Sequence, residues 1–81
     1  MRIDNNTTYQ TSDLACAAVL SLFFAIESVD KADPRRAYFL FERTPKLDTI
    51  LGKYQKQELQ VEPRAYFDQI KALKTRLYEP V

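Results

Sequence analysis

The amino-acid sequence predicts an α+β domain in which a three-stranded, antiparallel sheet is packed with helices, in the order β-α-β-β-α-α. Two runs, Thr7–Thr11 and Arg36–Glu42, alternate between two side-chain faces with the period of a strand. Beyond Thr44, apolar residues recur every three or four positions, which is the period of a helix. Residues that begin helices stand at Asp13, Thr44 and Pro63. These signals place each strand and each helix in turn.

The first helix is predicted to follow Thr11-Ser12-Asp13, because each of these side chains can accept a hydrogen bond from a free first-turn N–H. The segment Leu14–Leu22 is apolar around its whole circumference, so we expect it to be covered on most sides. In so small a domain this also suggests a surface for a partner. No Gly or Pro closes the helix, and we expect strand from about Ala25.

A hairpin is predicted next. Asp30 to Pro34 has the composition of a turn, and we interpret Asp30 and Asp33 as turn formers rather than cation ligands. The following strand, Arg36–Glu42, carries Phe39 and Phe41 on one face and large apolar residues on the other as well. We therefore expect it to be the central strand of the sheet.

Two more helices complete the fold. Thr44-Pro45 predicts an N-cap followed by proline in the first turn, and Gly52 falls on the solvent side of the second helix. Pro63 opens a third helix that we expect to run to about Tyr78, before Pro80 ends it. The apolar stripe of the second helix is predicted to comprise Leu47, Ile50, Leu51 and Tyr54, and that of the third Tyr66, Phe67, Ile70, Leu73 and Leu77.

Composition excludes most enzyme classes. The chain has 81 residues, 46% hydrophobic and 28% charged, which suits one domain over residues 1–81 with residues 1–6 frayed. It has no His, one Cys and one Gly, and so lacks the parts of a His-based triad, a Cys/His zinc site or a Gly-rich phosphate loop. We expect a protein that is not an enzyme, with no cofactor, no metal and no small-molecule substrate.

The apolar segments and the single cysteine also indicate the cellular compartment. The longest apolar stretch, Leu14–Ile26, is shorter than the roughly 20 residues that span a bilayer, and no secretory signal pattern is present. Cys16 has no partner for a disulfide, and its alanine neighbours predict a buried, unreactive thiol. We expect a cytoplasmic protein with no membrane association.

A resemblance adds to this interpretation. Thr11-Ser12-Asp13-Leu14, the strand Tyr38-Phe39-Leu40-Phe41, and the pattern from Pro63 through Tyr66-Phe67, Ile70-Lys71 and Leu73-Lys74 resemble a family of short bacterial and phage-type domains of unknown function. The similarity covers about Tyr9 to Tyr78. Members tend to carry a Gly after the first helix, where this chain has Ser21-Leu22-Phe23-Phe24. The resemblance implies a bacterial or mobile-element origin and no particular activity.

Lys74 has an unusual position, because at 100° per residue it falls inside the apolar arc of the third helix, between Ile70 and Phe67. One interpretation is a snorkelling lysine whose ammonium reaches water or a carboxylate such as Asp13 or Glu27. The other is a strip for phosphates and stacked bases. The candidate nucleic-acid-binding residues are Arg64, Phe67, Lys71, Lys74 and Tyr78, with Arg35 and Arg36 at the hairpin.

The charge distribution leaves two functions open. The chain has 12 Lys+Arg and 11 Asp+Glu, a net +1, but residues 1–33 carry net −3 and residues 34–81 net +4. The first hypothesis is a small, non-enzymatic accessory protein that binds nucleic acid through the basic and aromatic edge of the third helix. The second is a protein-interaction or dimerisation module, such as a phage-type inhibitor or adaptor, that uses the apolar first helix.

Overall fold

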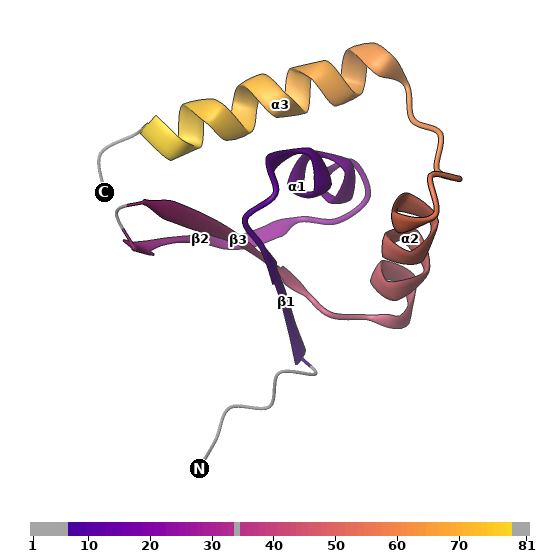
Figure 1. Cartoon of the computed structure of the whole chain (residues 1–81), viewed down its shortest axis with the longest axis horizontal. Coiled ribbons are helices and arrows are strands. Elements are labelled where there is room, and N and C mark those ends of the chain that lie inside the picture. Colours follow the sequence, from indigo (N-terminus) through magenta and orange to yellow (C-terminus); the bar gives the residue numbers. More distant parts are fainter. Residues whose placement is uncertain (1–6, 34, 79–81) are drawn as a thin grey trace.

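The computed structural model describes residues 7–33 and 35–78 and confirms the predicted α+β fold. The expected fraying of residues 1–6 and the expected stop at Pro80 lie outside these residues. In chain order (Figure 1) the elements are β1 (Thr8–Thr11), α1 (Leu14–Ser21), β2 (Ile26–Asp33), β3 (Arg36–Glu42), α2 (Pro45–Gln55) and α3 (Pro63–Tyr78).

The sheet is antiparallel throughout and has the strand order β1-β3-β2, so β3 is central as predicted. Phe39 pairs with Thr11 on one side and Val29 on the other, and Phe41 pairs with Tyr9 and Ile26. Directly opposed residues share a face, so these side chains form the inner surface of the sheet. Phe39 and Phe41 are almost completely buried there.

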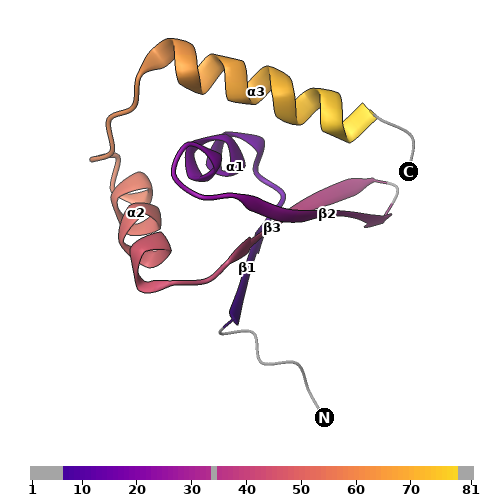
Figure 2. The same cartoon turned by 180° about the vertical axis from the view of Figure 1, so that it is seen from behind.

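Helix α1 is the centre of the molecule. It lies between the sheet and α3, with α2 beside it, as both views show (Figures 1 and 2). Asp13 begins it as predicted, since its Oδ1 accepts a hydrogen bond from the Ala15 N–H at 3.0 Å. Cys16–Leu20 are all buried, and the rest of the helix is half-buried. The apolar circumference of α1 is therefore covered within the chain.

The segments around β2 differ from the sequence expectation in detail. Helix α1 ends at Ser21, and strand begins at Ile26 rather than Ala25. The expected turn at Asp30–Pro34 was too long, because β2 continues to Asp33 with a register shift between Asp30 and Asp33. Both aspartates nevertheless bond the backbone two residues on: Asp30 accepts from Ala32 N, and Asp33 from Arg35 N, each at 2.9 Å. Such bonds support a bulge inside a strand as well as a turn.

Helix α2 begins as predicted, with the Thr44 hydroxyl accepting from Leu47 N at 3.1 Å and Pro45 in the first turn. Leu47 and Leu51 bury its inner side. At its C-terminal end Gln57 adopts a positive φ of 62°. There the Gln57 N–H bonds to Tyr54 O and the Glu58 N–H to Lys53 O, which is the hydrogen-bond pattern that closes a helix before a change of direction.

Close packing around α1 predicts a large cost for added volume there. Ala18 is 0% exposed, so Ala18→Leu should lower the free energy of unfolding by about 1–3 kcal/mol. The same change at exposed Ala72 on α3 should alter it by less than about 0.5 kcal/mol. Urea unfolding followed by circular dichroism measures both. Equal midpoints for the two variants would contradict the covered position of α1.

Candidate nucleic-acid interface

Helix α3 has a buried side that packs on α1 and an opposite side in solvent. Leu73 is 2% exposed, and Tyr66, Ile70 and Leu77 are half-buried against the core. Phe67 was expected in this apolar stripe, but it is 59% exposed. It lies about 60° around the helix from Ile70, beyond the edge that α1 covers. The predicted apolar arc was therefore too wide by this residue.

The solvent side of α3 brings together every candidate residue that the sequence analysis placed on this helix. The residues recur at intervals of three, four, three and four, so they follow one line along the helix. All of them are exposed, and Tyr78 is 82% exposed. Phe67 and Tyr78 are two of the three large hydrophobic residues exposed in the described part of the chain. We call this line the α3 stripe: Arg64, Phe67, Lys71, Lys74 and Tyr78.

Neighbouring groups hold the lysines of the α3 stripe only loosely. Lys71 Nζ lies 5.0 Å from the centroid of the Phe67 ring, within the range of a cation–π contact. It also lies 3.9 Å from Asp68 Oδ1, in an ion pair whose side chains are both about 60% exposed. An ion pair this exposed stabilises the fold very little. The Lys71 ammonium can therefore exchange these contacts for a ligand.

The structure shows neither proposed carboxylate partner beside a snorkelling Lys74 and leaves its ammonium in water. The residue is exposed and makes no hydrogen bond or ion pair with any described residue. The proposed carboxylate partners are occupied or exposed elsewhere: Asp13 caps α1 and accepts from the Tyr54 hydroxyl at 3.5 Å, and Glu27 lies exposed on β2. The sequence alone could not show that, on this flank of α3, Ile70 is the last residue packed against the core.

An open hollow of about 550 Å³ lies at the N-terminal half of the α3 stripe. Arg64, Phe67 and Lys71 line it together with the carboxylates of Glu62 and Asp68. Glu62 Oε1 accepts a hydrogen bond from Ala65 N at 2.7 Å, so this carboxylate is used in starting the helix. The hollow therefore offers a ring and two cations to an occupant from solvent.

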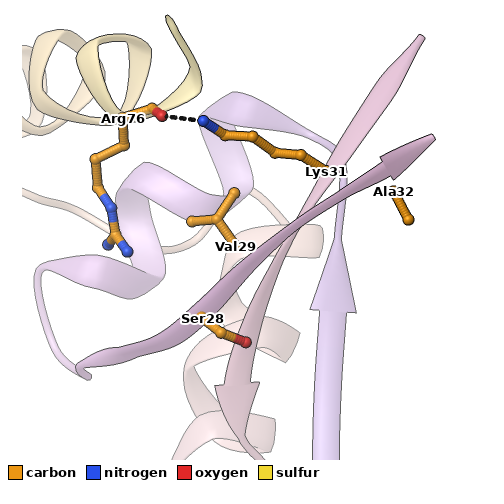
Figure 3. A pocket seen from close by; sticks show the side chains of 5 residues that line it. All are labelled: Ser28, Val29, Lys31, Ala32 and Arg76. Atoms are coloured by element: carbon orange, nitrogen blue, oxygen red, sulfur yellow. Dashed lines mark hydrogen bonds between the residues drawn. The ribbon is translucent and has the colours of Figure 1, made fainter. Parts of the chain in front are cut away.

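The other end of α3 carries a second hollow, of about 540 Å³, between the last helical turn and strand β2 (Figure 3). Lys31 Nζ donates a hydrogen bond to the Arg76 backbone oxygen at 2.7 Å. A cation at the C-terminal end of a helix is favourable, because the last carbonyls lack partners and the helix dipole is negative there. Lys31 thus fixes the end of α3 on the sheet. In the sequence Lys31 lies among acidic, turn-type neighbours, so no local pattern marks it as the partner of a helix end.

The two hairpin arginines lie apart from the α3 stripe. Arg35 follows β2 and Arg36 begins β3, and both are exposed. The hairpin end lies on the same side of the molecule as the C-terminal end of α3 (Figures 1 and 2). These arginines can extend the positive surface beyond the helix, but the structure does not make them part of the stripe.

Cys16 is buried, as expected, and its surroundings disfavour the thiolate. Burial is the main cause that raises the pKa of the thiol, and the negative charge of Asp13 adds to it. The Tyr9 hydroxyl lies 4.0 Å from Sγ, and burial likewise raises the pKa of this phenol. A nucleophilic cysteine needs the opposite environment. Within residues 7–33 and 35–78 there is also no group of three His, Cys, Asp or Glu residues that could hold a metal, and no helix long and apolar enough to cross a membrane.

These raised pKa values predict that stability falls at alkaline pH. The unfolded thiol and phenols titrate near 9.0 and 10.0, whereas the folded protein retains the same protons to higher pH. The folded state then binds more protons than the unfolded state, so the free energy of unfolding decreases as pH rises above about 9. Urea unfolding at about pH 7 and pH 10 measures the decrease, and Cys16→Ala should make it smaller. A free energy that is the same at both pH values would contradict the burial of these groups.

The exposed position of Lys74 predicts that it contributes little to folding. Lys74→Met should change the free energy of unfolding by less than about 0.5 kcal/mol, because the ammonium lacks a partner in the described fold. Thermal unfolding measures this change. A loss of several kcal/mol would instead reveal a buried carboxylate left without its cation.

Comparison with known proteins gives a family and no activity. The family model described as Domain of unknown function (DUF5659) matches residues 6–79, which is nearly the whole chain. No curated protein and no solved structure matches this chain. The resemblance drawn from the capped first helix, the aromatic strand and the third-helix pattern is thereby confirmed for a family of short domains of unknown function. The chain belongs to the DUF5659 family.

Proposed function

We propose that this protein is a small, non-enzymatic accessory protein that binds nucleic acid through the α3 stripe. One observation carries the proposal: three cations and two aromatic rings share a single solvent-exposed line on one helix. Cations contact phosphates, and exposed rings offer flat apolar surfaces to bases. Few other ligands use both kinds of group at this spacing.

Charge is concentrated on this helix. Residues Pro63–Tyr78 contain four cations, Arg64, Lys71, Lys74 and Arg76, against the single carboxylate of Asp68, which is a net +3. The whole chain has a net charge of only +1. The remaining residues therefore sum to −2, and a polyanion is attracted to α3 rather than to the molecule as a whole.

The expected binding is weak and tolerant of sequence. The cations of the stripe are two lysines and one arginine, which suit phosphate contacts more than the reading of base edges. With about three or four phosphate contacts, the affinity should fall steeply with salt. We propose this activity for a bacterial or phage protein in the cytoplasm, where the free Cys16 thiol is kept reduced.

The alternative is a protein-interaction or dimerisation module that docks through the first helix. It was suggested by the apolar circumference of this helix, which burial within the chain also explains. Cys16–Leu20 of helix α1 are buried and its other residues are half-buried, because the sheet, α2 and α3 already cover it. A partner could reach it only by displacing α3. Burial within the chain accounts for the same apolar sequence at no such cost.

Removing two charges from the α3 stripe tests the proposal. Lys71→Gln combined with Lys74→Gln should weaken the binding of a fluorescein-labelled oligonucleotide by about 1 kcal/mol or more, because two phosphate contacts are lost. Fluorescence anisotropy at low salt measures the affinity. Lys53→Gln with Lys56→Gln, on α2 and its C-cap, changes the net charge equally and should have a much smaller effect.

Two results would refute the proposal. One is the absence of binding at tens of micromolar protein in low salt. The other is an equal loss of affinity in the α2 and α3 double variants, since that would show attraction by net charge alone. Circular dichroism of both variants provides the check on folding.

A further inference from the structure

We infer that the nucleic acid recognised by the α3 stripe is single-stranded, with bases stacked on Phe67 and Tyr78. This inference rests on the proposed function and adds the class of ligand. It starts from the exposure of the two rings, 59% for Phe67 and 82% for Tyr78. Exposed rings beside cations offer a ligand flat apolar surfaces and positive charge at the same place.

A duplex cannot use these rings well. Its bases already stack on one another, so their faces are closed to side chains, and only base edges are accessible in the grooves. Phe67 has no polar atom with which to contact a base edge or a phosphate. In a single strand the base faces are free, and stacking on aromatic side chains is the usual source of affinity.

The order of residues along the stripe fits a strand that runs along the helix. It reads Arg64, Phe67, Lys71, Lys74, Tyr78: a cation, a ring, two cations and a second ring. Eleven residues separate the rings, which is about 16 Å along the axis. Phosphates between two stacked bases would thus meet Lys71 and Lys74. Lys71 Nζ lies over one face of the Phe67 ring, 5.0 Å from its centroid, so a base stacks on the opposite face or displaces the ammonium toward its own phosphate.

The surroundings of Phe67 support the same ligand. The open hollow of about 550 Å³ beside the ring provides room for a base, and Arg64 and Lys71 border it. The carboxylates of Glu62 and Asp68 also border the hollow, so a neutral base suits this place better than a phosphate does.

Tryptophan substitution gives a direct test, because the chain contains no Trp. Phe67→Trp introduces a single fluorophore into the stripe, and an oligothymidine of about 15 nucleotides should quench its emission through stacking. Phe23→Trp provides the control, since Phe23 is the remaining exposed aromatic, at 47%, and lies between α1 and β2. Its emission should not change with the same oligonucleotide.

Affinities measured by anisotropy complete the test. The parent protein should bind the single strand at least about fivefold more tightly than the duplex formed with its complement. Phe67→Leu and Tyr78→Leu should each weaken single-strand binding at least about fivefold, while Phe67→Trp retains it and Phe23→Leu leaves it unchanged. Because Phe67 and Tyr78 are exposed, these variants should keep the fold, which circular dichroism checks.

The outcomes separate the inference from the proposed function. Duplex binding that equals or exceeds single-strand binding, with Phe67→Leu harmless and the Phe67→Trp emission unaltered, would overturn the inference and leave nucleic-acid binding in place. The absence of binding to both forms would overturn both.

Discussion

The burial of α1 is the constraint on which this fold depends. A helix that is apolar around its whole circumference cannot rest on a sheet alone, because its other side would remain in water. Here the inner face of the sheet covers one side, and α2 and α3 cover the others. Alanines at positions 17 and 18, both 0% exposed, allow these elements to approach closely. The helix thereby acts as the core of the domain.

This arrangement determines which side of α3 is free. Leu73 and its half-buried neighbours must face α1, so the helix can turn only its opposite side to solvent. The bond from Lys31 to the Arg76 carbonyl fixes the last turn on β2. A helix held along its inner side and at its end presents the exposed side chains in a constant orientation. The candidate site therefore follows from the way in which the core is closed.

The chemistry of the molecule is divided between its interior and its surface. Cys16 is buried and Tyr9 and Tyr54 beside it are half-buried, and burial raises the pKa of all three groups, which favours their protonated forms. The α3 stripe exposes cations and rings to a ligand, and the exposed hairpin arginines lie apart from it. Groups of this kind are the ones that the proposed binding of nucleic acid would use.

The sequence determined the elements because their signals are local. Asp13 and Thr44 begin helices by accepting hydrogen bonds from nearby backbone N–H groups, and Pro63 begins one because its fixed φ suits the first turn. Alternation marked β3 as a strand with two apolar faces. Helical spacing also aligned the five residues of the α3 stripe. The local signals predicted the end of β2 less exactly, because the hydrogen bonds of Asp30 and Asp33 support a bulge within the strand as readily as a turn.

Tertiary structure decided what covers each face. Periodicity predicts where Phe67 and Lys74 lie around the axis of α3, but not whether α1 covers them. On that flank of α3, Ile70 is half-buried, whereas Phe67 and Lys74 beyond it are exposed. The partner of Lys31 likewise lies 45 residues away along the chain, and no local pattern predicts it. An all-apolar helix had suggested either a core or an interface, and only the positions of the sheet, α2 and α3 showed that it forms the core. Whether a residue is buried depends on how segments far apart in the chain pack together, so no pattern within one segment can predict it.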